Sequence, residues 1–182
     1  EDAEISEIEN EQAHSVASES GMPVSTYDPR KWSENWNSFQ KRAHQFSSRK
    51  KFHFFLKFDI ANFYDSVNLK ILEDKIRLVS PKHQSQTIEL LFHFLHNWNR
   101  RLERYSEKSV GIPQDDIGDC SRILANFYLQ DYDAFMKKEC DKRSALYLRY
   151  ADDQIIFAKN ERMAKEILFE ASKELFKINL NI

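Results

Sequence analysis

The sequence predicts an α+β fold, and two observations lead to this class. Aromatic residues are plentiful, with 14 Phe, 7 Tyr and 3 Trp, whereas the turn formers Gly and Pro number only 3 and 4. This balance favours a helix-rich α+β domain over an all-β domain with many turns. The predicted elements run strand, helices, hairpin, helix and strand start, which is not the alternation of a doubly wound sheet. At 182 residues the chain is long enough for one domain with a hydrophobic core.

The N-terminal part of the chain divides into two segments. Residues 1–28 are acidic at first and then rich in Ser, so we expect a flexible lead-in. The spacing of Trp32, Trp36, Phe39 and Ala43 then predicts a helix with one apolar stripe.

A strand and two helices are predicted next. The strand covers the apolar run at residues 52–58, and Asn68 is the expected N-cap of a first helix that Pro81 ends. A second, longer helix is expected over residues 84–104, with basic residues in its last turns. The apolar residues expected on one face of these helices are Leu69, Leu72, Ile76 and Val79 in the first, and Ile88, Leu91, Phe92, Leu95 and Trp98 in the second.

The C-terminal third is predicted to hold a helix, a hairpin and a second helix. Ser121 is the expected N-cap of the first helix. The apolar stripe of that helix comprises Ile123, Leu124, Phe127, Tyr128 and Phe135. Two apolar runs flank Tyr-Ala-Asp-Asp at residues 150–153, which predicts a tight β-hairpin with two aspartates at its tip. An amphipathic helix over residues 163–176 follows, and a strand is expected to start near residue 179.

The charge distribution is compatible with a nucleic-acid partner. Residues 1–20 hold seven of the 29 acidic residues and no Lys or Arg, so the rest of the chain carries 27 basic against 22 acidic residues, a net charge of +5. The two cysteines, Cys120 and Cys140, lack the spacing of a metal-binding pair, which predicts a reducing, cytoplasmic environment. No apolar run reaches the length of a membrane span, so no membrane partner is expected.

Three carboxylates are predicted to meet at strand ends. Asp59 follows the first strand, and Asp152 and Asp153 occupy the hairpin tip. Two adjacent aspartates repel each other unless a cation lies between them. Three carboxylates from two strand ends are suited to hold a pair of Mg²⁺ ions, which is the chemistry of nucleotidyl transfer. For each aspartate alone, the alternative is an ordinary solvated turn residue.

Four segments, in order along the chain, resemble the catalytic motifs of reverse transcriptases. They are Phe-Asp-Ile-Ala-Asn-Phe-Tyr-Asp-Ser-Val at residues 58–67, Gly-Ile-Pro-Gln at 111–114 with Ser-Arg-Ile-Leu-Ala-Asn-Phe-Tyr-Leu at 121–129, Tyr-Ala-Asp-Asp at 150–153, and residues 175–181. The resemblance implies a polymerase palm, in which a small antiparallel sheet is backed by helices. Asn-Phe-Tyr-Asp-Ser at 62–66 and Trp-Asn-Arg at 98–100 look closest to bacterial abortive-infection and defence-associated reverse transcriptases.

The resemblance implies a metal-dependent site within a divided chain. Asp59, Asp152 and Asp153 would be catalytic and would hold two Mg²⁺ ions, for which Mn²⁺ could substitute, with the carbonyl of Ile60 as a further ligand. The implied palm covers residues 52–182. The lead-in at 1–28 and a helical segment at 29–51, as part of the fingers, would precede it, and the fingers and thumb would be incomplete.

The resemblance also assigns contacts with the nucleotide, the template and the primer. The residues implied at the nucleotide are Asn62, Phe63, Tyr64 and Gln114, and those implied at the template or primer are Ser121, Arg122, Asn126 and Tyr150. The ring of Tyr64 is implied to exclude a 2′-hydroxyl sterically and so to favour dNTPs. From the residues alone, the alternatives are a core aromatic for Tyr64 and a solvated helix surface for Arg122 and Asn126.

The second motif departs from the family pattern. The family usually continues after the Gln with Gly, whereas Asp115 and Asp116 follow Gln114 here, and the loop before Ser121 is two residues longer. Acidic residues beside a template path repel phosphate, so an unusual grip on the template or an unusual choice of nucleotide is expected.

The function implied is RNA-directed DNA polymerisation in bacterial antiphage defence. The partners would be dNTPs, an RNA template, which could be a dedicated non-coding RNA, and the DNA product. A first alternative is template-independent or protein-primed DNA synthesis, which the unusual loop after Gln114 favours. A second is a catalytically idle palm that serves as an RNA-binding or assembly scaffold. The residues leave open whether the chain forms an oligomer or binds a partner protein.

Overall fold

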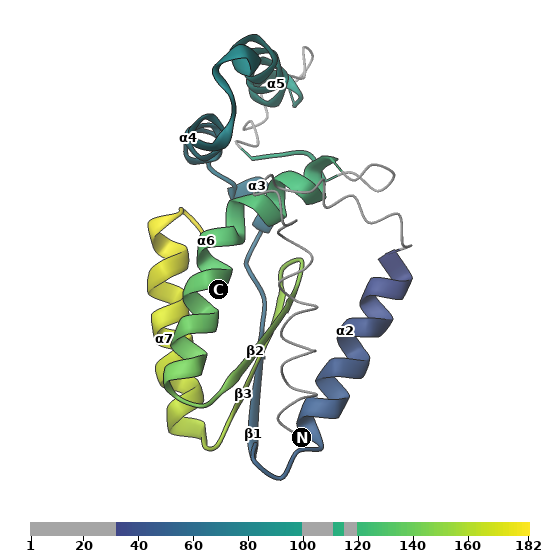
Figure 1. Ribbon diagram of the computed structural model, residues 1–182, viewed down its shortest axis with the longest axis vertical. Helices are drawn as coiled ribbons and strands as arrows, with labels where there is room; N and C mark the ends of the chain where they lie inside the picture. The colour runs from purple at the N-terminus through teal and green to yellow at the C-terminus, as the bar shows by residue number, and fades with distance from the viewer. Residues whose placement is uncertain (1–31, 100–110, 115–119) are drawn as a thin grey trace. The chain divides into compact units, whose positions relative to one another are not determined.

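A three-stranded antiparallel sheet lies at the centre of the described part of the chain, with helices on both of its faces (Figure 1). The computed structural model describes residues 32–99, 111–114 and 120–182, which all belong to one compact unit. The strands are β1 (Phe54–Phe58), β2 (Leu146–Tyr150) and β3 (Asp153–Ala158), in the spatial order β1-β3-β2. The predicted α+β class, with a small antiparallel sheet backed by helices, is confirmed.

Helix α2 (Trp32–Ser47) covers one face of the sheet, called the α2 face here. Side chains alternate between the two faces along each strand. On the α2 face, Phe39 and Phe46 of the helix pack against Leu148 of β2 and Phe157 of β3, and all four are buried. The predicted N-terminal helix is therefore confirmed.

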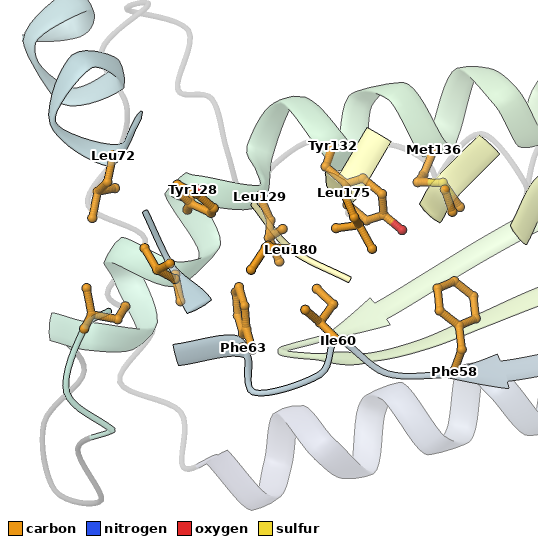
Figure 2. Close-up of a cluster of buried hydrophobic side chains, with 14 of the residues drawn as sticks. Phe58, Ile60, Phe63, Leu72, Tyr128, Leu129, Tyr132, Met136, Leu175 and Leu180 are labelled. Atoms are coloured by element: carbon orange, nitrogen blue, oxygen red, sulfur yellow. The ribbon is translucent and has the colours of Figure 1, made fainter. Parts of the chain in front are cut away.

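Helices α6 (Cys120–Lys142) and α7 (Glu161–Lys177) cover the opposite face, called the α6 face (Figure 1). The main hydrophobic cluster lies between these helices and the sheet and continues past the end of β1. Figure 2 shows side chains of this cluster, among them Phe58, Ile60, Phe63, Leu129, Tyr132 and Leu175. The segment that follows β1 is thus anchored in the core by alternate apolar residues.

The segment between β1 and α6 forms short helices. They are α3 (Phe63–Ser66), α4 (Leu69–Val79) and α5 (Ser85–Asn97), with the 3-10 turn η1 (Lys82–Gln84) before α5. Asn68 caps α4 as predicted, because its side-chain oxygen accepts hydrogen bonds from the backbone N–H groups of Lys70 and Ile71, at 3.0 and 3.2 Å.

The predicted hairpin and C-terminal helix are also confirmed, as the β2–β3 pair and α7. Asn160 caps α7, since its side-chain oxygen accepts a hydrogen bond from the backbone N–H of Met163 at 2.9 Å. In the described ranges, no helix combines the length and the apolar character needed to cross a membrane.

Several predicted element ends differ from the structure. Helix α5 ends at Asn97 rather than at residue 104. Helix α6 begins at Cys120, so Ser121 is buried in its first turn and is not its N-cap. No strand is formed by residues 178–182, although the backbone N–H of Ala61 donates to the carbonyl of Asn181 at 2.9 Å. The lead-in at 1–28, the acidic residues after Gln114, and Arg100, Arg101 and Arg104 lie outside the described residues.

The apolar stripe predicted for α6 does face the core, but residues outside that stripe make up most of the fully buried positions. The buried residues of α6 are Ser121, Ala125, Tyr128, Leu129, Tyr132, Met136, Glu139 and Cys140. Of the predicted stripe, Tyr128 is fully buried, Leu124, Phe127 and Phe135 are partly buried against the core, and Ile123 is exposed. Two of the buried residues are polar groups with partners, since the Tyr132 hydroxyl donates to Gln154 and Glu139 pairs with Arg143. Hydropathy alone predicts that polar residues such as these face solvent. They can be buried here because each has a hydrogen-bonding or ionic partner.

Candidate active site

The strand register brings the three predicted carboxylates to one end of the sheet. Phe58, the last residue of β1, pairs with Gln154 of β3, so Asp59 continues from β1 toward the position of Asp153. Asp153 in turn pairs with Tyr150 of β2. We call the sheet end that carries Asp59, Asp152 and Asp153 the acidic end.

The hairpin turn that carries Asp152 has only two residues. Because Tyr150 and Asp153 are paired, Ala151 and Asp152 form the whole turn. Ala151 adopts a positive φ of 54°, a conformation that costs a residue other than glycine about 1–2 kcal/mol. Other contacts of the hairpin must therefore favour this turn over a relaxed one.

The three carboxylates of the acidic end differ in their partners. Asp153 forms an ion pair with Lys57 of β1, with 2.7 Å between Nζ and Oδ1. None of the ion pairs between described residues involves Asp59 or Asp152. Asp59 is exposed and Asp152 is half-buried. Asp59 and Asp152 therefore have no cationic side chain within ion-pair distance among the described residues.

The donor set suits a magnesium site that a bound nucleotide completes. Within the parts of the chain that the structure describes, no three His, Cys, Asp or Glu side chains are arranged to hold a metal ion by themselves. Mg²⁺ in nucleotide enzymes is usually held by one or two carboxylates together with substrate phosphates, not by a cage of protein ligands. Asp59 and Asp152 fit that pattern, whereas Asp153 is paired with Lys57.

Arg149, next to the hairpin tip and only 10% exposed, connects the hairpin to helix α6. The guanidinium of Arg149 donates from Nε and Nη2 to the two carboxylate oxygens of Asp133, at 2.8 and 2.5 Å. Its Nη1 donates to the carbonyl of Ala151 at 2.8 Å and to the side-chain oxygen of Asn126 at 3.1 Å. Burial lowers the pKa of Arg149, whereas the hydrogen bonds and charge of Asp133, together with Tyr147 and Tyr132, raise it. The net shift of the pKa is upward, so the group stays charged.

Polar side chains continue this network beneath the sheet. The hydroxyls of Tyr132 and Tyr147 both donate to the side-chain oxygen of the fully buried Gln154, at 2.6 and 2.9 Å. The Tyr147 hydroxyl also lies 3.3 Å from Oδ1 of Asp133. Nε2 of Gln154 has no hydrogen-bond partner within the described structure. Burial raises the pKa of both tyrosines, so both remain protonated donors at neutral pH.

Tyr64 lies beside the hairpin tip, in the short helix α3. Burial raises the pKa of its phenol, the negative charge of Asp152 raises it further, and the positive charge of Arg122 lowers it. The pKa of Tyr150 is likewise raised by burial and lowered by Arg122. The structure therefore brings together four of the predicted site residues, Asp152, Tyr64, Arg122 and Tyr150.

The loop at 111–114 is docked on the backbone of Tyr64. The backbone N–H of Ile112 donates to the Tyr64 carbonyl at 2.9 Å, and Nε1 of Trp98 donates to the Gly111 carbonyl at 3.0 Å. A Cβ at position 111 would lie 1.9 Å from the Tyr64 carbonyl oxygen, so only glycine allows this approach. Gln114, two residues beyond Ile112, is exposed.

The residues just after Asp59 divide between core and surface. Ile60 and Phe63 are buried, so only their backbone groups are available to a metal ion or a nucleotide. Asn62 is exposed and adopts the left-handed conformation at the start of α3, with φ of 46° and ψ of 45°. Their predicted contacts with metal and triphosphate stay predictions.

The predicted template and primer residues have different surroundings. Ser121 is buried, Arg122 is half-buried and Asn126 is exposed, with its side-chain oxygen on Arg149. Tyr150 points to the α2 face, where its ring lies 5.3 Å from Trp36 and 5.9 Å from Phe39 between centroids. Of these four residues, Arg122 and Tyr150 act on the pKa of Tyr64. Contacts of these four residues with nucleic acid stay predictions.

Sequence reasoning missed the residues that support the carboxylates. Arg149, Asp133 and Lys57 carry the ion pairs on either side of the hairpin. One signal was present, because Arg149 is a charged residue within a strand that the apolar pattern predicts to be buried. A buried arginine needs an acidic partner, but the sequence does not say which carboxylate supplies it.

Comparison with known proteins agrees with the four motifs. The family model described as reverse transcriptase (RNA-dependent DNA polymerase) matches residues 7–182, so the match starts well before the first motif. A search of the curated proteins finds no match. Because the family model covers nearly the whole sequence, the chain belongs to the reverse transcriptase family, whose members are RNA-directed DNA polymerases and thus nucleotidyltransferases.

Proposed function

We propose that the chain adds dNTPs to a 3′-hydroxyl at the acidic end of the sheet. The observation that carries this proposal is the register, which leads Asp59 from β1 toward the hairpin that presents Asp152, while neither carboxylate has an ionic partner among the described residues. Membership of the reverse transcriptase family supports the same reading. The nucleic-acid template is RNA and the substrates are deoxynucleotides, as the family implies.

Asp59 and Asp152, with the carbonyl of Ile60, would hold the metal ions in this proposal. When bound, two Mg²⁺ ions, or Mn²⁺ in their place, lower the pKa of the primer 3′-hydroxyl and neutralise the triphosphate and the departing pyrophosphate. The backbone N–H groups of Asn62 and Phe63 and the exposed Gln114 would contact the nucleotide. The Lys57 ammonium neutralises Asp153, which limits repulsion among the three carboxylates.

Tyr64 would select the sugar of the incoming nucleotide. Its ring is half-buried beside Asp152, and its backbone is fixed by the loop at Gly111 and Ile112. A ring held in this way cannot move aside at low cost, so a 2′-hydroxyl that meets it would be excluded sterically.

The test is nucleotide incorporation by the full chain, purified with its bound nucleic acid. Each labelled dNTP and NTP is supplied with Mg²⁺, and Asp152→Asn is compared with Asp141→Asn, an exposed aspartate on α6. We expect product only from dNTPs, lost in Asp152→Asn and kept in Asp141→Asn. Tyr64→Val should add incorporation of NTPs. Absence of product with every nucleotide would favour the idle scaffold, and RNase resistance of an active sample would favour template-independent synthesis.

A defence role and a cytoplasmic location are further parts of the proposal. The sequences of residues 62–66 and 98–100 support a place among bacterial defence-associated reverse transcriptases, and the two free cysteines, Cys120 and Cys140, support a reducing compartment. Phage plating on cells that carry the wild type or Asp59→Asn tests the role. Protection that is lost in the variant supports catalysis in defence, and protection that persists favours the scaffold.

A further inference from the structure

The ion pair between Arg149 and Asp133 is bidentate and lies next to the acidic end. Arg149 lies in β2 on the α6 face, and its side chain is only 10% exposed. Its guanidinium donates to four acceptor atoms on three residues, Asp133, Asn126 and Ala151. A planar fork of donors fixes the direction of each bond, which a lysine ammonium does not do.

Such a pair, in which the Arg149 side chain is 10% exposed and the Asp133 side chain 35% exposed, is poor evidence for a role in stability alone. Desolvation of two charges often outweighs their attraction, and apolar replacements of buried pairs are frequently neutral or stabilising. A partly buried pair with two parallel hydrogen bonds is therefore better explained by the position that it imposes. The Arg149 pair imposes position on the hairpin turn, because one of its bonds ends on the turn carbonyl of Ala151.

The bond to Ala151 acts one residue before the carboxylate of Asp152. Ala151 has a positive φ of 54°, which a non-glycine residue adopts only when other contacts favour it. The Arg149 guanidinium supplies such a contact from within the same hairpin. At its other side it holds Asn126 and Asp133, which lie seven residues apart and so on the same face of α6. Arg149 thus connects the hairpin turn to two residues of α6, Asn126 and Asp133.

We propose that Arg149 and Asp133 are positioning residues that set where the hairpin places Asp152. This inference rests on the proposed polymerase function, because Asp152 is taken as a metal-holding carboxylate. Neither positioning residue touches the substrate in this proposal. Their effect passes through Ala151 and the hairpin turn.

The test compares this pair with a second arginine–carboxylate pair, at the C-terminal end of α6. Arg143 and Glu139 pair near the C-terminal end of α6, and the Glu139 side chain is buried, but their contacts stay within that end of the helix. Glu139 pairs with Lys142 as well as with Arg143, so Glu139→Gln is a control for the loss of ionic contacts of α6 away from the hairpin. The test variants are Arg149→Met, Asp133→Asn and their double mutant.

Steady-state incorporation of a dNTP by the full chain gives the first readout. We expect Arg149→Met to lower kcat by about 10- to 100-fold, as loss of residues that orient metal ligands usually does, with little change in KM. The double mutant should be no worse than the poorer single variant, because both substitutions remove one pair. Glu139→Gln should keep kcat near the wild-type value. Additive losses, or an equal loss in Glu139→Gln at matched stability, would overturn the proposal.

Amide hydrogen exchange across residues 146–156, without metal or nucleotide, gives a readout that does not depend on activity. Arg149→Met and Asp133→Asn should speed exchange in this hairpin, and Glu139→Gln should leave it unchanged. Unchanged exchange in Arg149→Met would overturn the positioning role even if the enzyme is active. If the wild type makes no product, the proposed function has failed, and the exchange data alone decide whether the pair holds the hairpin.

Discussion

The two faces of the sheet differ most where they reach the acidic end. On the α6 face, Arg149 and Gln154 belong to a buried network of hydrogen bonds. On the α2 face, Tyr150 packs against Trp36 and Phe39, and the ion pair is that of Lys57 with Asp153. The Arg149 side chain is 10% exposed and that of Lys57 is 56% exposed.

This difference separates two tasks that charged residues perform around a cluster of carboxylates. A nearly buried guanidinium with four acceptors fixes the geometry of the hairpin, because each bond is directional and the two bonds to Asp133 are charge-assisted. An exposed ammonium with a flexible stem offsets charge without fixing a position, and such a pair contributes about 0–1 kcal/mol to stability. The predictions below test this division, from the largest expected effect to the smallest.

Phe157→Ala should give the largest loss of stability, because the α2 face is held by apolar packing. The Phe157 ring is buried and lies 5.8 Å from the ring of Phe46 and 6.3 Å from that of Phe52. Truncation of a buried Phe lowers the free energy of unfolding by about 3–5 kcal/mol. Phe55, the strand partner of Phe157, is 64% exposed, so Phe55→Ala is the control and should cost far less in urea unfolding. Equal losses in the two variants would show that this face is not a packed core.

Gln154→Leu tests the α6 face, where the interior is polar. The substitution leaves the buried Tyr132 hydroxyl without its acceptor, which should lower the free energy of unfolding by about 1–3 kcal/mol. Adding Tyr132→Phe removes the orphaned hydroxyl and should recover part of the loss. A Gln154→Leu variant that is more stable than the wild type would mean that the network serves no structural purpose.

Alkaline pH should weaken the α6 face through the same tyrosine. Burial raises the pKa of Tyr132 above its ordinary value of 10.0, so its contribution to stability is complete below pH 10 and is lost as the pH rises above it. Between pH 9 and pH 11 the free energy of unfolding should fall by about 1 kcal/mol more in the wild type than in Tyr132→Phe. Parallel pH profiles for the two proteins would contradict this assignment.

Lys57→Met should have the smallest effect, because the exposed pair offsets charge only. The free energy of unfolding should change by about 1 kcal/mol or less. Removing a positive charge beside Asp153 should also lower the Mg²⁺ concentration that half-activates incorporation, by about fivefold or less at a surface site. A loss of kcat as large as that expected for Arg149→Met would erase the difference between the two faces.

Much of the fold could be predicted because its signals are local. The apolar run that forms β1, the Asn68 cap and the two runs that form the hairpin each need only neighbouring residues to be recognised. The polar members of the buried face of α6 could not be predicted in the same way. Tyr132 and Glu139 are buried there because of partners that hydropathy does not reveal, Gln154 in β3 and Arg143 beyond the end of the helix.

The carboxylates of the candidate site could be predicted from the sequence, but the ion pairs around them could not. Asp59 and Asp152 follow from strand ends and from the resemblance to the family, and the register places them at the same end of the sheet. The pairings of Arg149 with Asp133 and of Lys57 with Asp153 depend on how α6 and β1 pack against the hairpin. The sequence does not distinguish which acidic residue pairs with each basic residue. The pairing is set by how the helices and strands pack together.

The central claim is that Asp59 and Asp152 form one metal-dependent site. Its most direct test is to measure Mn²⁺ binding by the full chain, in the presence of a non-hydrolysable dNTP, with electron paramagnetic resonance. If Asp59 and Asp152 hold the ion together with the triphosphate, Asp59→Asn and Asp152→Asn should each weaken binding by about tenfold or more, whereas Asp141→Asn should not. Undiminished Mn²⁺ binding in a folded Asp59→Asn protein would contradict the claim that the two strand ends form one metal-dependent site.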